Sequence, residues 1–198
     1  MRVLREKTMI SIKLPTDEAT VRSLHIGDEV LLTGVIVTAR DAAHKYMVTE
    51  KPKDLDPILR NNVIYHCGPI VKKVGEKWYM VCAGPTTSIR EEPFEAEVIE
   101  MYGVRGIIGK GGMGPKTLAA CKEFGAVYLH ATGGCAAELA CAMTEVLDVK
   151  KLEFGTPEAF WVIQVKDFPC TVTMDSHGQS LHAIVEEESK KVLESLIR

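Results

Sequence analysis

The sequence has no long hydrophobic run and no excess of basic residues. No apolar stretch among its 198 residues approaches the roughly 20 residues that a membrane-spanning helix needs. Residues 1–7 lack the apolar core of a secretory signal. The 24 lysines and arginines are outnumbered by 27 aspartates and glutamates, so the basic face that general nucleic-acid binding requires is missing. We therefore expect a cytoplasmic protein that binds neither membranes nor nucleic acids.

Cysteine pairs with metal-binding spacing are also missing. None of the six cysteines belongs to a Cys-x-x-Cys pair, and their spacing matches no common zinc or iron–sulfur pattern. Most have apolar neighbours, as Cys82 and Cys141 do, so we expect most of them to be buried reduced thiols. Cys135 differs because it follows two glycines at a predicted helix start, where the helix lowers the pKa of a thiol. The sequence thus predicts no metal ligand in this chain.

Repeats and low-complexity linkers are absent, and the chain is long enough to bury a real core. Up to about residue 83 it is rich in strands joined by glycine-containing turns, with a short helix through His44 and Met47. The strands of this part are predicted at residues 8–14, 29–38, 63–66, 70–72 and 77–82. From about residue 90, helices and strands alternate. We predict one domain over residues 1–198 with an α/β fold, in which a β-rich first half packs on an α/β second half.

The second half contains clear helix signals. Pro115 and Gly125 bracket one helix in the expected asymmetry. The stripe formed by Ala136, Leu139 and Met143 is typical of an amphipathic helix that continues to Val146. The helices are predicted at residues 94–102, 115–124, 136–146 and 181–196, and the strands at 106–108, 126–130, 160–165 and 171–174.

The segment 83–90, with the sequence AGPTTSIR, carries the strongest chemical signal. Three hydroxyl residues follow a Gly-Pro break, and Arg90 closes the turn between a predicted strand and a predicted helix. Hydroxyls and backbone N–H groups at a helix start favour an anion, and a guanidinium matches a carboxylate or a phosphate. The residues alone leave two interpretations: a site for a small anion, or a capped helix start with a solvated arginine.

A second glycine-rich loop, residues 109–114, matches G-x-G-x-x-G between a strand and a helix. The acidic residue that a dinucleotide site has about 20 positions further on is missing. Pro115 removes an N–H group that a P-loop would use for phosphate. We interpret the glycines as bringing Lys110 and bare backbone close to a small anionic ligand, the alternative being a tight turn with a solvated lysine.

Three cations, Arg40, Arg90 and Lys110, follow predicted strands. The loops of Arg90 and Lys110 each lie between a strand and a helix, so we expect them at the same edge of a sheet. Cations with hydroxyls between them suit a compact dicarboxylate better than a nucleotide.

Four motifs occur in order: GxxxTARDxAHK at 34–45, YHCGP at 65–69, AGPTTSxR at 83–90 and GxxGKGGM at 106–113. Together with DFP at 167–169 and DSxG at 175–178, they resemble the C-terminal domain, or separate β subunit, of class I iron–sulfur fumarate hydratases and L-tartrate dehydratases. The resemblance covers nearly the whole chain. It implies a swivelling β/β/α domain, in agreement with the pattern of strands and helices above.

The resemblance also implies an activity and a partner. The chain would be the β subunit of a fumarate hydratase that interconverts fumarate and (S)-malate and is active only with an α subunit, in a hetero-oligomer such as α2β2. The [4Fe–4S] cluster of such enzymes is held by three cysteines of the α subunit or N-terminal domain. Alternatives are the β subunit of an L(+)-tartrate dehydratase and a non-catalytic dicarboxylate-binding module.

The same resemblance places substrate contacts on Arg40, Thr86, Arg90 and Lys110. The threonine that matches Thr86 is a proposed proton acceptor in this family, assisted by the arginine that matches Arg90, so these two are the candidate catalytic residues. Because an unassisted hydroxyl is a very poor base at neutral pH, this role requires a strong local positive field.

Overall fold

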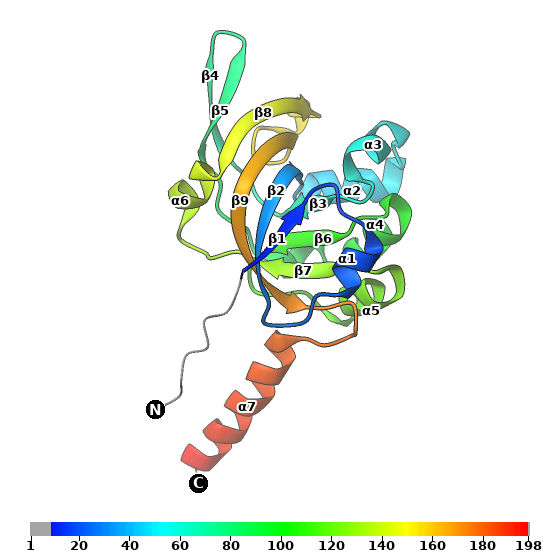
Figure 1. Ribbon diagram of the computed structural model, residues 1–198, viewed down its shortest axis with the longest axis vertical. Coiled ribbons are helices and arrows are strands. Elements are labelled where there is room, and N and C mark those ends of the chain that lie inside the picture. Colours follow the sequence, from blue (N-terminus) through cyan, green and yellow to red (C-terminus); the bar gives the residue numbers. More distant parts are fainter. Residues whose placement is uncertain (1–8, 198) are drawn as a thin grey trace.

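A seven-stranded mixed sheet forms the centre of the protein in a computed structural model that describes residues 9–197 (Figure 1). The strands are β1 (Ile10–Lys13), β2 (Glu29–Thr38), β3 (Val63–Tyr65), β4 (Ile70–Val74), β5 (Lys77–Cys82), β6 (Gly106–Gly109), β7 (Val127–His130), β8 (Met143–Lys150) and β9 (Phe160–Met174). The sheet has the order β1-β2-β3-β6-β7-β9-β8, and β4 and β5 form a separate antiparallel hairpin. The mixed α/β fold predicted from the sequence is confirmed.

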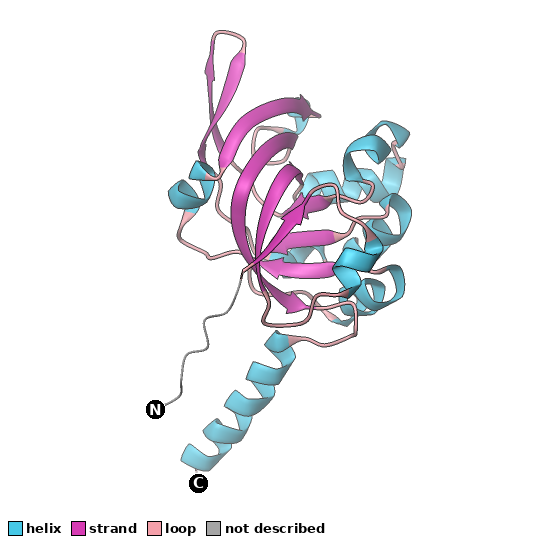
Figure 2. Ribbon diagram, viewed as in Figure 1, coloured by secondary structure: helices cyan, strands magenta, loops and turns pink. Residues whose placement is uncertain are grey.

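The helices lie mostly on one side of the sheet. They are α1 (Glu18–Arg22), α2 (Asp41–Glu50), α3 (Asp56–Leu59), α4 (Glu95–Tyr102), α5 (Pro115–Phe124), α6 (Ala136–Cys141) and α7 (Leu181–Leu196), with short 3-10 helices at Lys53–Leu55, Ser88–Glu91 and Leu152–Phe154. Figure 2 shows α2 to α5 together beside the strands, whereas α6 lies near the hairpin and α7 projects away from the body. No helix among the described residues combines the length and apolar character needed to cross a membrane.

Strand β9 closes the sheet on itself. It pairs antiparallel with β7 and β8, and also with β2, so that β2, β3, β6, β7 and β9 form a closed ring. The other neighbouring pairs from β1 to β7 are parallel. Parallel strands are buried on both faces, which explains the continuous apolar runs at Ile107–Ile108 and 127–129. The carboxyl ends of β2, β3 and β6 therefore meet at one edge of the sheet.

Aromatic side chains fix the hairpin and the loop that follows it. Trp78 of β5 packs edge-on against Trp161 of β9, with ring centroids 5.2 Å apart. Tyr65, at the end of β3, packs against Phe168 and donates a 2.6 Å hydrogen bond to the carbonyl oxygen of Ala83. The start of the segment 83–90 is thus attached to the core at the carboxyl end of β3.

Two sequence-based expectations were wrong in this half. The helix predicted over 136–146 ends at Cys141, and residues from Met143 onward form strand β8. Pairing of β8 with the buried strand β9 outweighs the helical stripe, and the sequence MTEVLDVK is rich in β-branched residues. The two strands predicted on either side of 167–169 are one strand, which accommodates Asp167 at φ 53° where its pairing with β2 shifts register.

Gly34 lies at this shift in register and has a backbone conformation that favours glycine. This residue has φ +136°, and a β-carbon here would overlap the backbone oxygen of Leu14. We expect Gly34→Ala to lower the free energy of unfolding by about 2–4 kcal/mol, through backbone strain and overpacking. Denaturant unfolding of the purified chain measures this change.

Gly133→Ala is the control for that experiment, because Gly133 is exposed and its β-carbon would contact only the side chain of Lys110, at 3.4 Å. A change within about 0.5 kcal/mol is expected there. Equal effects of the two substitutions would contradict the account of Gly34.

Candidate functional site

The three predicted cations lie on neighbouring loops. Arg40 follows β2 and is the residue before α2, and Lys110 directly follows β6. Arg90 lies in the 3-10 helix after the hairpin, so it does not follow a strand of the main sheet as expected. Its loop nevertheless adjoins that of Lys110, because Thr87 and Lys110 form a β-bridge and the N–H of Ser88 donates to the carbonyl oxygen of Lys110 (3.1 Å).

Asp41 joins the two arginines at the surface. Arg90 Nη2 donates to Asp41 Oδ2 (2.8 Å) and to Thr86 Oγ1 (3.2 Å), and Arg40 Nη2 lies 3.6 Å from the same carboxylate oxygen. The side chains of Arg90 and Asp41 are each 44% exposed. An exposed ion pair contributes about 1 kcal/mol at most, so an incoming carboxylate can replace Asp41 as the partner of Arg90.

Arg40 is held more firmly than Arg90. Its Nε lies 3.4 Å from Glu158 Oε1, and the other oxygen of Glu158 accepts a hydrogen bond from the N–H of Ala42 in the first turn of α2. Gly68 of the YHCGP motif lies against the guanidinium, and a β-carbon at that position would overlap Arg40 Nη1. The motif glycine is therefore explained by the close approach of the arginine.

The hydroxyls of the segment 83–90 do not all face one point. Thr86 Oγ1 lies beside Arg90, but Ser88 is buried, and its hydroxyl contacts His66 Nδ1 (2.9 Å) and Tyr128 Oη (2.8 Å). The N–H of Thr86 donates to the carbonyl oxygen of His66 (2.7 Å). The expected cradle of hydroxyls and N–H groups is therefore wrong for Ser88, which belongs to the interior.

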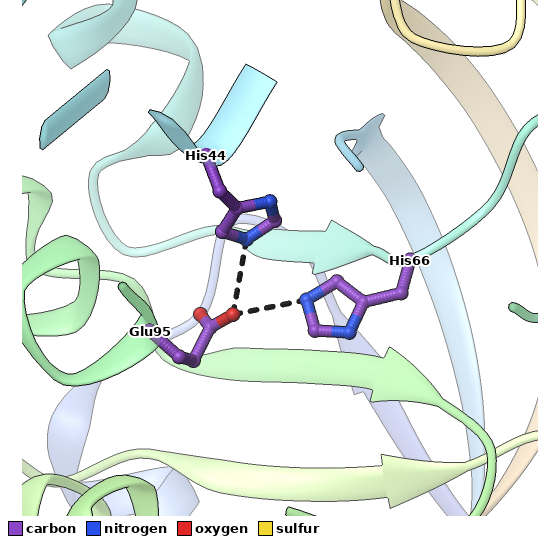
Figure 3. A group of neighbouring side chains, drawn as sticks. All are labelled: His44, His66 and Glu95. Atoms are coloured by element: carbon purple, nitrogen blue, oxygen red, sulfur yellow. Dashed lines mark hydrogen bonds and ion pairs between the residues drawn. The ribbon is translucent and has the colours of Figure 1, made fainter. Parts of the chain in front are cut away.

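A buried polar network lies beneath the arginines, and sequence reasoning missed it. Glu95 of α4 places one oxygen, Oε2, 3.0 Å from His44 Nε2 and 2.9 Å from His66 Nε2 (Figure 3). All three side chains are fully buried. With Ser88 and Tyr128 they form what we call the buried histidine network. Both histidines lie in the motifs TARDxAH and YHCGP, but no sequence spacing connects them to each other or to Glu95.

The charges of this network follow from its contacts. Burial lowers the pKa of His44, but the charge and hydrogen bond of Glu95, with the charge of Glu91, outweigh burial and raise the pKa to about 9. Burial raises the pKa of Glu95, but His44 and His66 outweigh it and hold the pKa at about 2. For His66, burial prevails and lowers the pKa. His44 and Glu95 therefore form a buried ion pair beside a neutral His66.

Glu91 is a second buried carboxyl group beside the pair. Its Oε2 lies 3.7 Å from His44 Nδ1, and neither of its oxygens has a hydrogen-bond partner. Burial raises its pKa to about 7. Its side chain therefore loses its proton close to neutral pH.

The donor atoms of the described residues do not fit an iron–sulfur cluster. Cys67, Cys121 and Cys170 are buried, Cys82 is half-buried, and Cys135 and Cys141 are exposed. The expectation that most of the cysteines are buried was therefore wrong, and Cys141 departs from it most. Within residues 9–197, the one place where the ligand atoms of three histidine, cysteine, aspartate or glutamate side chains converge is formed by His44, His66 and Glu95. That group could hold a single metal ion, but each of its converging atoms is already in a hydrogen bond.

The fold and the site together define a mixed α/β protein with a group of cationic side chains at one edge of the sheet. A family model described as the fumarase C-terminus matches residues 2–185, and the chain belongs to this family. It is 47% identical over 190 residues to a protein of Geobacillus stearothermophilus named as a class I fumarate hydratase. This match covers 95% of the chain but only 36% of the relative, so the chain spans about a third of that protein.

Other relatives are similar in length to this chain. The L(+)-tartrate dehydratase subunit beta of Escherichia coli K12 is 42% identical over 179 residues, which cover 90% of this chain and 87% of the relative. A protein of Methanocaldococcus jannaschii named as the same subunit is 46% identical over 180 residues, covering 89% and 91%. The family resemblance inferred from the four motifs is confirmed.

The buried charges predict how stability depends on pH. The pKa of His44 is about 9 in the folded protein and an ordinary 6.5 in the unfolded chain. The contribution of His44 to the free energy of unfolding is therefore complete below pH 6.5 and is lost as the pH rises through 9. The stability linked to Glu91, whose pKa is raised from 4.5 to about 7, also falls with rising pH, but mostly below pH 7. We expect the melting temperature to fall by at least about 3 °C between pH 6.5 and 9.

Differential scanning calorimetry of wild type and His44→Gln tests this expectation. The variant should have a lower melting temperature than wild type at pH 6.5. Its melting temperature should fall less between pH 6.5 and 9, because it lacks the group whose proton is released. A fall of the same size in both proteins would show that other groups cause it.

Proposed function

We propose that this chain is the β subunit of a class I fumarate hydratase, a hydro-lyase that interconverts fumarate and (S)-malate. Membership of the fumarase C-terminus family supports an activity as a carbon–oxygen lyase, and the relatives above are named as fumarate hydratase or tartrate dehydratase. The observation that carries the proposal is the partly exposed group formed by Arg40, Thr86, Arg90 and, on the adjoining loop, Lys110. Its cations have the sign of charge that attracts the two carboxylates of a dicarboxylate.

In this proposal Thr86 accepts the proton from the carbon next to the hydroxyl-bearing carbon of malate. Arg90 Nη2 donates to Thr86 Oγ1. For the base role the threonine has first lost its own proton to solvent, and its oxygen then has a lone pair to face the substrate C–H. The contact with Arg90 stabilises the negative charge that the oxygen must carry as a base. The C–H electrons form the double bond as hydroxide leaves. Arg40 and Lys110 hold the carboxylates and stabilise the additional negative charge that develops on the substrate as the proton is removed.

The proposal assigns the [4Fe–4S] cluster to a partner α subunit, because the cysteines of the described residues do not come together. When bound there, the cluster supplies the Lewis acid for the departing hydroxide. A hetero-oligomer such as α2β2 is supported by the naming of several relatives as beta subunits and by the partly exposed group of cations.

An L(+)-tartrate dehydratase is the second candidate, favoured by the relatives that match this chain over most of their length. Anaerobic assay of the co-expressed pair with fumarate, malate and tartrate separates the two. Turnover of fumarate and malate at the highest kcat/KM supports the proposal. Preference for tartrate supports the second candidate, and binding without turnover of any of them leaves a non-catalytic dicarboxylate-binding module.

Arg40→Ala and Lys110→Ala are expected to weaken substrate binding in the co-expressed pair. A charge-assisted contact to a carboxylate is worth roughly 1.5–3 kcal/mol, so KM should rise about 10- to 150-fold, with a smaller loss of kcat. Steady-state kinetics with each dicarboxylate measure this. Lys116→Ala, at an exposed lysine of α5, is the control and should keep wild-type constants. Unchanged kinetics in Arg40→Ala and Lys110→Ala would reject the proposed carboxylate contacts.

Thr86→Val tests the proposed base. Valine keeps the β-branched shape but removes the hydroxyl, so turnover should be abolished while substrate affinity is largely retained. Arg90→Lys should also be severe, since an ammonium group does not reproduce the planar guanidinium. The measurement is exchange of the substrate C3 proton with deuterated water, compared with net dehydration. Exchange at the wild-type rate in Thr86→Val would remove Thr86 from the base role.

A further inference from the structure

We propose that the buried histidine network is a positioning device: it holds the loop of Arg40 and the loop of Thr86 in one fixed arrangement through a defined order of protons. The order is an imidazolium at His44, a carboxylate at Glu95 and a neutral His66 protonated at Nε2. The effect on turnover rests on the proposed function, whereas the order of protons does not.

The first contact is between His44 and the backbone of Arg40. The carbonyl oxygen of Arg40 accepts a hydrogen bond from the His44 backbone N–H (2.8 Å) and another from His44 Nδ1 (2.9 Å). A carbonyl oxygen only accepts, so Nδ1 must carry a proton. Arg40 has no side-chain cap of its own at the start of α2. His44 therefore fixes the peptide group from which the arginine side chain extends.

The second contact is between His66 and the loop of Thr86. The carbonyl oxygen of His66 accepts from the N–H of Thr86 (2.7 Å), and His66 Nδ1 lies 2.9 Å from the hydroxyl of Ser88. The residue after β3 thus holds the loop on both sides of Thr87. Gly109 makes room for this contact, because a β-carbon there would overlap Ser88 Oγ.

The direction of each hydrogen bond can be assigned along the network. Tyr128 Oη donates to Ser88 Oγ (2.8 Å). We assign the proton of the Ser88 hydroxyl to His66 Nδ1, the other hydrogen-bond partner of this oxygen (2.9 Å). His66 then carries its proton on Nε2 and donates to Glu95 Oε2 (2.9 Å). The other bond to this oxygen, from His44 Nε2 (3.0 Å), completes an imidazolium, since Nδ1 is protonated as well.

Another arrangement satisfies the same contacts, with the shared proton on Glu95 and a neutral His44. The ion pair is favoured because imidazole is a stronger base than carboxylate, and the directions of both pKa shifts widen that difference. Two hydrogen bonds to one carboxylate oxygen fix the relative orientation of α2, the end of β3 and α4, because hydrogen bonds are directional and apolar contacts are not.

Nitrogen-15 NMR of histidine-labelled full-length chain tests the order of protons without any assay of activity. At pH 7, both ring nitrogens of His44 should be protonated, and His66 should be neutral with its proton on Nε2. A neutral His44, or a His66 protonated on Nδ1, would overturn the assignment. So would a stoichiometric metal ion in the purified chain that is lost in His66→Gln.

The positioning role is tested with mild variants at the far end of the network. Ser88→Ala and Tyr128→Phe remove one hydroxyl each and leave the ion pair intact. In the co-expressed pair, Ser88→Ala should lower kcat/KM about 10-fold or more with each substrate that wild type accepts, and Tyr128→Phe less. In the chain alone, both should shift the backbone amide signal of Thr86.

Tyr102→Phe is the matched control. Tyr102 is equally buried, but its hydroxyl donates to the carbonyl oxygen of Met47 (3.3 Å), outside the network. This variant should lose comparable thermal stability and keep wild-type kcat/KM and the Thr86 signal. Equal losses of kcat/KM in Tyr102→Phe and Ser88→Ala would overturn the positioning role and show that the network only stabilises the fold. If wild type turns over no dicarboxylate, the proposed function fails, and the NMR measurements alone decide on the network.

Discussion

Two histidines donating to one buried oxygen of Glu95 connect the elements on which the cations at the sheet edge depend. His44 comes from α2, His66 from the end of β3 and Glu95 from α4, and none of the three side chains reaches the surface. Removing one member of such a pair leaves an uncompensated buried charge, which costs about 3–5 kcal/mol. The Arg90 side chain is 44% exposed and that of Arg40 is 22% exposed, so both reach solvent, whereas the His44–Glu95 pair lies in the interior.

The group of cations at the sheet edge is partly exposed to solvent. Arg90 is paired with Asp41 at the surface, and that pair is weak enough for a carboxylate to replace it. The glycine-rich loop that carries Lys110 is attached to the Thr86 loop by backbone contacts. A second protein surface facing this region would exclude water and strengthen each charge-assisted contact, which is consistent with relatives that are named as subunits.

The sequence predicted the fold class, both ends of the helix bracketed by Pro115 and Gly125, and the proximity of the loops of Arg90 and Lys110. These features depend on local patterns and on the short connections of parallel strands. It failed for residues 143–146, where pairing with β9 overrides a helical stripe, and for Ser88, whose hydroxyl turns inward. The network around Glu95 was not predictable, because its members come from three separate elements.

The central claim is that the sheet edge of this chain binds the carboxylates of the substrate. The most direct measurement is an anaerobic crystal structure of the co-expressed pair with bound malate. We expect carboxylate oxygens within hydrogen-bond distance of Arg40, Arg90 and Lys110, and Thr86 Oγ1 facing the carbon that loses its proton. Malate bound without contact to any of these four residues would contradict the account.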